Sequence, residues 1–418
     1  VYDAHKKLGI RSFRQGADNT RNTVANVDEE REAWREHFES LQKGREMVEE
    51  IVWKHVPQAQ NTETWLQEPP KWNEFIRSIK NMKNGKAARV DGVMAEFVKY
   101  APTKMKKHIY RIVVQMWQKA VEAENGREAK EWPAKWNTAV VIPLWKCKGN
   151  RKDKNTYRGI TLLSVGSKVL ARIVSMRTQG WTEPWLSENQ NGFRRGRGVD
   201  DALQVTRRVV EEIVRSKPGG DIVLMRMFDI EKAYPRVSKD GLWELMKRKG
   251  APEGFIKVCK ALHEHTSYRV RIHGGVSSEY LPDKGLREGC PSSPPLFNIY
   301  HDGVMSDFRE RRRKKAAETN IEPGIRWVYQ VDGAITHGYH KKGNAEATKH
   351  NRAHTTIIGD TGFADDTGII GHIEEATVAE QLLVTTMMDW KEKVHPGKTE
   401  GLRLSADDRQ PYDIRAHG

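Results

Sequence analysis

The chain has 418 residues and a net charge of +15, with 37% hydrophobic and 30% charged residues. This length allows two or three substructures with cores of their own, and no apolar run approaches the roughly 20 residues of a membrane span. The N-terminus has neither an initiator methionine nor an apolar signal region. We therefore expect a fragment of a longer intracellular polypeptide, nuclear or cytoplasmic. The three cysteines lie far apart, which fits neither a disulfide framework nor a CxxC metal site.

The positive charge is concentrated in one stretch of the chain. Residues 71–200 contain 27 Lys and Arg against 11 Asp and Glu, whereas residues 1–70 are slightly acidic and residues 201–418 are nearly balanced. A basic region joined to a neutral one suggests a polyanion-binding part attached to something else. The alternative is a basic protein that binds no polyanion.

In chain order, residues 28–50 carry apolar side chains at helical spacing among many charges and predict an amphipathic surface helix. A connector rich in Pro, Gln, Asn and Thr follows at 57–70. Residues 136–146, "WNTAVVIPLWK", predict a buried strand that runs into a basic loop, and a helix is expected at about 164–178.

The second half begins with "DIVLMRMFDI" (221–230), a near-continuous apolar strand, followed by a helix at 252–265. Residues 267–282 alternate apolar and polar side chains, as a half-exposed hairpin does. The polar composition of residues 309–358 predicts an insertion. Its "ERRRKK" run is typical of a solvated helix face, and the alternatives are a nuclear-localisation or phosphate-binding patch.

Two adjacent aspartates, Asp365 and Asp366, interrupt the β-prone stretch "TGFADDTGIIG". Aspartate is unfavourable in strands, and the simplest interpretation is the polar turn of a hairpin. However, Asp229 also ends a buried strand, where a carboxylate is costly unless it is paired. If the two strand ends are neighbours, three carboxylates share one site. Such a site suits Mg²⁺, and two ions can promote phosphoryl transfer.

Seven segments, in the same order, resemble the reverse transcriptases of non-LTR (LINE-type) retrotransposons over residues 70–404. Any one of these segments is weak alone, but the ordered set is specific. The segments are "NGKAARVDGVMAEFVK", "YRGITLLSVGSKVLARI", "ENQNGFRRGRGVDDAL", "FDIEKAYPRV", "GLREGCPSSPPLFNIYHD", "GFADDT" and "HPGKTEGLRLS".

The resemblance implies an α+β right-hand polymerase fold with an antiparallel, ferredoxin- or RRM-like palm sheet backed by helices. Its parts would be an N-terminal extension (1–70), basic fingers (71–220), a palm (221–404) with the polar insertion (309–358), and the truncated start of a thumb (405–418). The implied activity is RNA-directed DNA synthesis, a nucleotidyl transfer that uses an RNA template, a DNA primer, dNTPs and two Mg²⁺ ions, with Mn²⁺ as an alternative.

The resemblance also assigns roles to individual residues. Asp229 and Asp365 would be the main metal ligands, assisted by the Ile230 carbonyl and with Asp366 beside them. Lys398 fits the general acid that protonates the leaving pyrophosphate.

The remaining roles concern the substrates. Lys146 and Arg158 match the positions that hold the incoming triphosphate, and Tyr234 matches the aromatic position that blocks a ribose 2′-hydroxyl. Gly289 would let the backbone approach the nucleotide. The two positions expected to contact the template are Phe193 and Arg194.

Two positions depart from the family pattern. Pro235 stands where an aspartate usually follows the aromatic residue, although proline is tolerated in the first turn of a helix. Glu288 replaces a glutamine, and an ionised carboxylate repels a triphosphate and cannot donate a hydrogen bond. These departures leave open a second hypothesis, an inactive relic that only binds nucleic acid. A third, an RNA-dependent RNA polymerase, is disfavoured by Tyr234.

Overall fold

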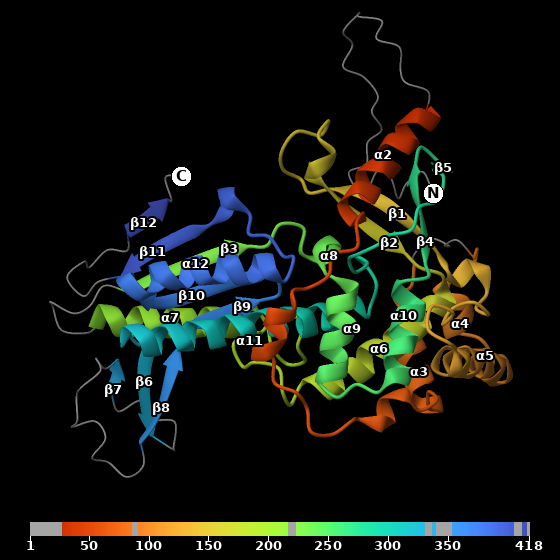
Figure 1. Ribbon diagram of the computed structural model, residues 1–418. Helices are drawn as coiled ribbons and strands as arrows, with labels where there is room; N and C mark the ends of the chain where they lie inside the picture. Colours follow the sequence, from red (N-terminus) through yellow and green to blue (C-terminus); the bar gives the residue numbers. More distant parts are fainter. Residues whose placement is uncertain are drawn as a thin grey trace, which may run out of the picture. The chain divides into compact units, whose positions relative to one another are not determined.

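A computed structural model describes residues 27–85, 91–215, 223–330, 337–339, 353–404 and 412–415 (Figure 1). The protein has an α+β fold, as predicted, and its chain forms two compact units. Unit 1 comprises residues 1–46, 58–181 and 234–297, and unit 2 comprises residues 47–57, 182–233 and 298–418. The chain therefore passes between the units several times, whereas contiguous fingers (71–220) and palm (221–404) were expected. The contacts that define the units join segments far apart in sequence, which local patterns do not report.

Unit 1 contains a four-stranded sheet of order β2-β1-β4-β5, in which β1 pairs antiparallel with β2 and parallel with β4. The strands are β1 (Thr138–Trp145), β2 (Tyr157–Leu162), β4 (Ser267–Ile272) and β5 (Gly275–Val276). The helices are α2 (Val27–Gln42), α3 (Trp72–Lys80), α4 (Ala95–Lys99), α5 (Thr103–Glu122), α6 (Val165–Thr182), α9 (Lys239–Arg248) and α10 (Glu253–His263). Short 3₁₀ turns lie at η2 (Thr64–Gln67), η3 (Ala134–Trp136) and η4 (Lys154–Thr156). The strand predicted at 136–146, the helices at about 164–178 and 252–265 and the hairpin at 267–282 are present, whereas the helix predicted over 28–50 ends at Gln42.

Helix α6 begins where it does because a carboxylate caps it. Asp91 Oδ2 accepts a hydrogen bond from the N–H of Val165, the first residue of the helix, at 3.0 Å. The first N–H groups of a helix have no intrahelical acceptor, and an aspartate near them is stabilising. The Asp91–Gly92 pair of the first resembling segment thus has a structural function that the sequence did not reveal.

Unit 2 is built on a five-stranded, entirely antiparallel sheet of order β12-β11-β3-β10-β9. Its strands are β3 (Val223–Asp229), β9 (Asp360–Phe363), β10 (Asp366–His372), β11 (Glu400–Leu404) and β12 (Tyr412–Arg415). The near-continuous apolar run that predicted a strand is therefore the central strand β3. Most of its side chains are buried, among them Val223, Leu224, Met225 and Phe228, because helices cover both faces of the sheet.

Helices cover both faces of this sheet. One core cluster joins α7 (Val199–Arg215) to the odd-numbered residues of β3, and its buried members include Val209, Ile213, Val223, Met225 and Ile370. On the other face, Arg226 of β3 forms an ion pair of 3.3 Å with Glu380 of α12 (Ile373–Asp389). Because successive side chains of a strand point to opposite faces, α7 and α12 lie on opposite sides of β3.

The segment predicted to be a polar insertion differs from that expectation. Helix α11 (Ser293–Thr319) continues through its first residues, and β6 (Ile325–Gln330), β7 (His337–Tyr339) and β8 (Ala353–Ile358) form a three-stranded sheet. Ile325 and Trp327 are buried in the same core cluster as β3. Residues 331–336 and 340–352 lie outside the described part.

The "ERRRKK" run within α11 is only partly a solvated face. Arg312 is buried and bound by Glu375, while Arg309 pairs with Asp360 at 2.7 Å. Only Arg313 and the two lysines after it have exposed side chains. The segment is polar in composition because its charges pair inside the fold, and composition alone does not distinguish buried ion pairs from solvated ones.

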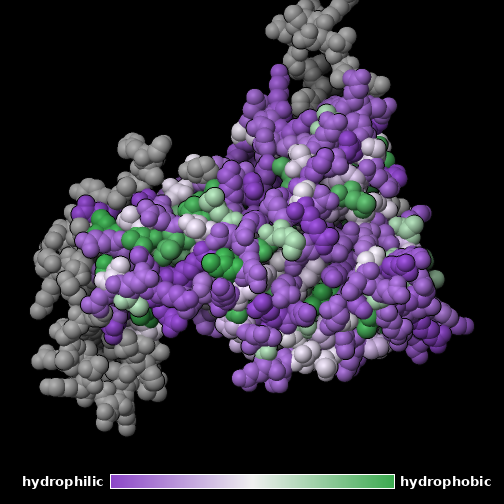
Figure 2. Space-filling view, in the orientation of Figure 1, coloured by the Kyte–Doolittle hydropathy of each residue, from purple (hydrophilic) through white to green (hydrophobic). Residues whose placement is uncertain are grey.

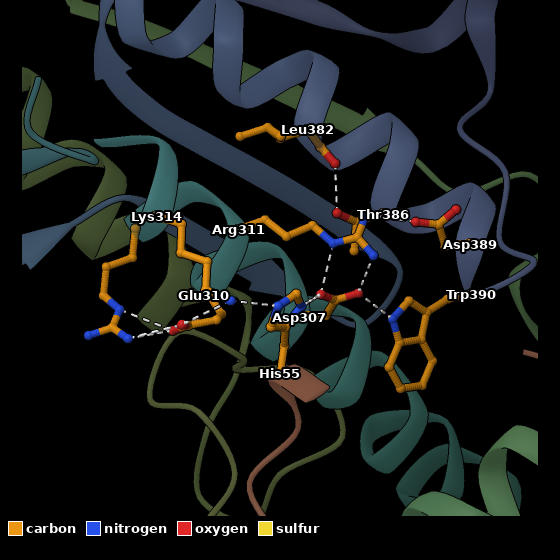
Figure 3. Close-up of polar contacts among 10 residues, drawn as sticks. His55, Asp307, Glu310, Arg311, Lys314, Leu382, Thr386, Asp389 and Trp390 are labelled. Atoms are coloured by element: carbon orange, nitrogen blue, oxygen red, sulfur yellow. Dashed lines mark hydrogen bonds and ion pairs between the residues drawn. The ribbon is translucent and has the colours of Figure 1, made fainter. Parts of the chain in front are cut away.

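A buried carboxylate on α11 fastens residues 47–57 to unit 2 (Figure 3). Asp307 is fully buried and accepts two hydrogen bonds from Arg311, of 2.8 and 3.0 Å, and one from the indole of Trp390 at 2.9 Å. His55, at the end of η1 (Glu50–His55), places Nδ1 2.6 Å from the same carboxylate. Arg311 also reaches Asp389 of α12, so one network joins three elements.

The visible surface is mostly hydrophilic, with apolar side chains gathered over α12 (Figure 2), where Ile373 and Met388 are exposed. Among the described helices, none is long and apolar enough to cross a membrane.

We predict that Asp307→Asn lowers the free energy of unfolding by about 3 kcal/mol, because it removes the buried charge that binds Arg311 and His55 and leaves Arg311 with Asp389 alone. Urea unfolding monitored by circular dichroism measures this change. The control is Lys315→Ala, which breaks an exposed pair with Glu318 on the same helix and should cost less than about 0.5 kcal/mol. Equal effects of the two substitutions would contradict the assigned role of Asp307.

Candidate functional site

The register of two neighbouring strands brings two carboxylates together. Asp229, the last residue of β3, lies directly opposite Asp366, the first residue of β10. Directly opposed residues of an antiparallel pair have Cβ atoms only about 5 Å apart, and like charges in such a pair are destabilising. The two strand ends are therefore neighbours, as the sequence predicted, and their carboxylates repel each other unless a cation is present.

The third carboxylate belongs to the turn that joins β9 to β10. Phe363 pairs with Asp366, so Ala364 and Asp365 form a two-residue hairpin loop. The aspartates therefore do lie at a hairpin turn, as the simplest interpretation predicts. Ala364 has φ = 60°, a left-handed conformation that costs a residue with a Cβ about 1–2 kcal/mol. Glycine is the usual residue here, so the conformation of Ala364 has to be held by its surroundings.

The electrostatic environment of the three carboxylates shifts the pKa of one of them, Asp366. Partial desolvation, together with the neighbouring Asp365 and Asp229, raises the pKa of Asp366 above its usual value of 3.8. Lys398 opposes this effect. Its ammonium group donates a hydrogen bond to Asp229 Oδ2 and so places a positive charge at the carboxylates.

Backbone bonds fix the position of Lys398. The N–H of His395 donates to the carbonyl of Asp229 at 2.8 Å, and Ile230 forms an antiparallel bridge with Val394. Lys398 then ends the short 3₁₀ turn η6 (Pro396–Lys398). The chain that leaves β3 is thereby joined to the segment before β11, and Lys398 is held beside the end of β3.

The residues predicted to bind metal form an incomplete set in this conformation. Within the described ranges, no three Asp, Glu, His or Cys side chains are close enough together to hold a metal ion. The three aspartates nevertheless supply the hard oxygen ligands that Mg²⁺ prefers, and their mutual repulsion is what a divalent cation would relieve. The bonds around Ile230 use the Asp229 carbonyl and the Glu231 N–H, and neither uses the Ile230 carbonyl that was predicted to assist.

Two of the predicted phosphate-binding cations lie on one hairpin of unit 1. Arg158 of β2 is paired with Leu144 of β1, and its side chain is exposed. Lys146 follows β1 immediately, and its N–H donates to the carbonyl of Thr156 at 2.9 Å. Since residues two apart along a strand share a face, Lys146 and Arg158 are diagonal neighbours on one face of the hairpin. The Lys146 ammonium group donates to the Asn155 carbonyl at 3.0 Å.

Tyr234 lies in α8 (Ala233–Arg236), half-buried, with its ring stacked on that of Phe297 at a centroid distance of 5.2 Å. Pro235 lies within the only turn of this short helix, where its missing N–H costs no helical hydrogen bond. The expectation that the backbone tolerates proline at this position is therefore met in the structure.

Gly289, predicted to let the backbone approach the nucleotide, is required for another reason: the backbone of β2 lies too close to leave room for a side chain. Gly289 has φ = 97°, and a Cβ placed on it would lie 2.9 Å from the carbonyl oxygen of Thr161 in β2. The carbonyl of the preceding residue, Glu288, accepts a hydrogen bond of 2.7 Å from the Thr161 N–H. A glycine is therefore needed here to dock this segment against β2, whether or not a nucleotide binds.

The two candidate template contacts have different environments. The Phe193 side chain is 37% exposed, on a backbone with φ = 58°. The Arg194 guanidinium is buried, lies 2.7 Å from Glu183 and donates to the carbonyls of Ser187 and Gln190. Arg194 thus binds its own chain, which departs from the prediction that it contacts the template. A charged residue in a basic motif gives no signal of such burial.

Nothing in the sequence was a reason to select Gln190. In the structure its side chain forms hydrogen bonds with the backbone of Ala364, in the turn that carries the candidate metal ligand Asp365. A polar "ENQNG" stretch indicates a loop, and nothing in it shows which amide faces β9.

Comparisons with known proteins agree with the predicted resemblance. The profile of the family described as reverse transcriptase (RNA-dependent DNA polymerase) matches residues 148–409. The probable RNA-directed DNA polymerase from transposon X-element of Drosophila melanogaster is 29% identical over 179 residues, which are 42% of this chain and 19% of that protein. The transposon TX1 uncharacterized 149 kDa protein of Xenopus laevis is 22% identical over 63% of this chain and 19% of its own length.

A third relative, the Pol polyprotein from the type-2 retrotransposable element R2DM of Drosophila melanogaster, is 30% identical over 37% of this chain and 14% of its own length. The chain thus spans a fifth or less of the length of these curated relatives.

We predict that Asp366→Asn stabilises the metal-free protein at pH 7, by less than about 1 kcal/mol because solvent screens this carboxylate. Since the folded-state pKa of Asp366 is raised, ionisation costs stability as the pH rises through that pKa. The advantage of the asparagine variant should therefore shrink as the pH falls toward 3.8, the usual value. Thermal unfolding across this pH range, with Asp200→Asn as an exposed control, measures it. A variant less stable than the parent at pH 7 would refute the repulsion.

Proposed function

We propose that this chain, which belongs to the reverse transcriptase (RNA-dependent DNA polymerase) family, is the polymerase part of a non-LTR retrotransposon protein. It would extend a DNA primer on an RNA template with dNTPs. The observation that carries the proposal is the opposition of Asp229 and Asp366 beside Asp365, inside the segment that the family profile matches. In the terms of a right-hand polymerase, unit 2 would supply the ferredoxin- or RRM-like palm and most of unit 1 the fingers.

Asp229, Asp365 and Asp366 would hold divalent cations, two Mg²⁺ ions or Mn²⁺ in their place, with the Ile230 carbonyl as a further ligand. Such cations supply electrostatic stabilisation of the attacking and leaving oxygens during phosphoryl transfer. Asp229 and Asp366 are directly opposed on one face of the sheet and Asp365 lies in the turn beside them, so strand pairing fixes their backbone positions before any substrate binds. Partial burial, and after it the neighbouring Asp365 and Asp229, raises the pKa of Asp366, so ionisation of the site without cations is costly and a bound cation would offset that cost.

Lys398 would act as the proton donor to the leaving pyrophosphate. In this structure its proton-bearing Nζ is bound to Asp229 and compensates the charge of that carboxylate. With cations bound at the aspartates, the attraction between Lys398 and Asp229 would be weaker and the ammonium group would be available to another anion. Lys398 would thus change from a counter-ion to a general acid, with its backbone held in place by the His395 and Ile230 contacts.

The triphosphate would be bound by the exposed face of the β1–β2 hairpin, through Lys146 and Arg158. Two cations that share one strand face form a fixed electrostatic clamp of the kind that accounts for most phosphoryl-transfer catalysis. Arg158 suits bidentate binding of phosphate oxygens, and Lys146 suits a point contact. Phe193, the exposed candidate of its pair, would contact the template.

Tyr234 would exclude ribonucleotides. A ring stacked on Phe297 is held rigidly, and a rigid aromatic edge can reject the additional 2′-hydroxyl of a ribose by steric overlap. This arrangement favours DNA synthesis over RNA synthesis, which requires a polar residue that accepts the hydroxyl.

The alternative function is an inactive relic that binds nucleic acid without extending a primer. Glu288 is the observation that favours it, because an ionised carboxylate in the triphosphate-binding segment would repel the substrate. Pro235 no longer supports this alternative, since the short helix accommodates it.

The first test is primer extension on a poly(rA) template with an oligo(dT) primer, dTTP and Mg²⁺. Asp229→Asn should reduce extension more than about a hundredfold, since the electrostatic stabilisation at stake is several kcal/mol. Binding of the primer-template, measured by fluorescence anisotropy, should be retained.

Asp200→Asn, the same chemical change at an exposed position of α7, should leave both quantities unchanged. A parent chain that binds the primer-template but extends no primer at any metal concentration would favour the relic. Equal extension by the parent and Asp229→Asn would exclude the proposed metal site.

The second test concerns Tyr234. Tyr234→Val keeps a small apolar side chain but removes the ring edge, so the ratio of ribonucleotide to deoxynucleotide incorporation should rise about tenfold or more. Competition between rUTP and dTTP in single-nucleotide extension measures the ratio. Met105→Val, on an exposed face of α5, is the control and should not change it. An unaltered ratio in Tyr234→Val would show that Tyr234 only packs against Phe297.

A further inference from the structure

The turn that carries Asp365 is held from outside the hairpin by one side chain. Gln190 is buried, and its Oε1 accepts hydrogen bonds from the N–H of Ala364 at 2.9 Å and of Gly192 at 2.8 Å. Its Nε2 donates to the carbonyl of Ala364 at 3.1 Å. Both backbone groups of the residue with the left-handed conformation are therefore bonded to the same carboxamide.

The backbone beside Gln190 is docked on the same hairpin. The N–H of Gly362 donates to the carbonyl of Asn189 at 2.8 Å, and the N–H of Asn191 donates to the carbonyl of Gly362 at 3.0 Å. A Cβ on Gly192 would lie 2.1 Å from the backbone nitrogen of Ala364, so only glycine permits this approach. Residues 189–192 thus extend the edge of the sheet alongside β9.

The loop is anchored in turn by its own contacts within unit 2. Asn298 Nδ2 donates to the carbonyl of Gly192 at 2.8 Å, and Arg194 donates to the carbonyl of Gln190 at 3.2 Å. Asn189 bonds to the buried Asp360, which is also bound by Arg309. A carboxamide fixed in this way can resist the relaxation of a strained residue, whereas a mobile one could not.

From these contacts we propose that Gln190 is a positioning residue for the metal-binding carboxylates. By holding Ala364 in its left-handed conformation, it fixes the direction in which Asp365, the next residue, leaves the turn. The inference rests on the proposed function, because it assigns to Asp365 the role of metal ligand. Gln190 lies about 170 positions before Ala364 in the sequence. The only role predicted for its segment was contact of neighbouring residues with the template.

The chemistry of the side chain suits this role. A carboxamide presents a donor and an acceptor together and so satisfies the N–H and the C=O of one residue. A glutamate of the same shape would keep the acceptor but lose the donor, and it would add a negative charge beside three aspartates. Gln190 therefore holds the turn without adding to the repulsion that the site already contains.

The test compares Gln190→Ala with Asn298→Ala, a control that removes a buried amide bond from the same loop without contact to Ala364. Amide hydrogen exchange in the peptide 361–366, measured by mass spectrometry on the metal-free chain, should accelerate about tenfold in Gln190→Ala, as expected for a lost buried hydrogen bond. Asn298→Ala, which loosens the loop but leaves both Gln190–Ala364 bonds in place, should accelerate exchange in this peptide clearly less, even if it lowers the melting temperature equally. Gln190→Glu, which keeps the volume, should give an intermediate acceleration and serves if Gln190→Ala does not fold.

A second measurement connects the turn to metal binding, with Mn²⁺ alone as the probe in calorimetric titrations. Gln190→Ala should weaken Mn²⁺ binding about tenfold relative to Asn298→Ala, the range typical for loss of an outer contact that orients a ligand. Adding Ala364→Gly to Gln190→Ala should restore most of the affinity, because glycine adopts the required conformation without support. A purely structural contribution of Gln190 would not be rescued at position 364.

The outcomes distinguish the positioning role of Gln190 from the proposed metal site itself. Exchange and Mn²⁺ affinity in Gln190→Ala equal to those of Asn298→Ala would overturn the positioning role. A parent chain that binds no Mn²⁺ would overturn the proposed metal site and with it the role of Gln190 in metal binding, while unaccelerated exchange would overturn its hold on the turn.

Discussion

The antiparallel register of β3 and β10 is the constraint on which the candidate site depends. Because side chains alternate along a strand, a shift of one residue would send Asp366 to the opposite face and place Thr367 opposite Asp229. The register is secured by burial on both sides of the sheet, where Met225 and Ile370 face α7 and Arg226 meets α12. Packing therefore selects this register, and the cost is a pair of directly opposed carboxylates.

The chain limits this cost locally. Lys398 reaches Asp229 because the segment leaving β3 and the segment entering β11 are bridged at Ile230 and Val394. A lysine on a flexible loop would lose conformational entropy each time it bound the carboxylate. The backbone of Lys398 is already held in place by hydrogen bonds, so this cost is smaller. A lysine with a fixed backbone and a mobile side chain suits the proposed site, in which divalent cations would replace the positive charge of the lysine during catalysis.

How much of this follows from the sequence depends on the range of the interaction. The strand ending at Asp229 and the turn at Asp365 were predictable, because apolar runs and polar interruptions are local signals. The α+β class, which the resemblance implied, is also met in the structure. The pairing of Arg312 inside the polar segment and the burial of Arg194 were not predictable, since each depends on an acid brought near by tertiary contacts. Gln190 is the least predictable case, because its partner Ala364 can be identified only when the segment that pairs with β9 is known.

The surplus of positive charge in residues 71–200 also has a clearer meaning in the structure. Several of its cations are neutralised internally, among them Arg177 by Glu74 and Arg194 by Glu183. The region has 27 cations and 11 acids, so its net charge stays strongly positive whichever pairs form within it. The field of the region therefore survives the loss of any one predicted contact. Affinity for a polyanion would be distributed over many residues, whereas the proposed chemistry would depend on three aspartates, two of which are placed by the register of β3 and β10.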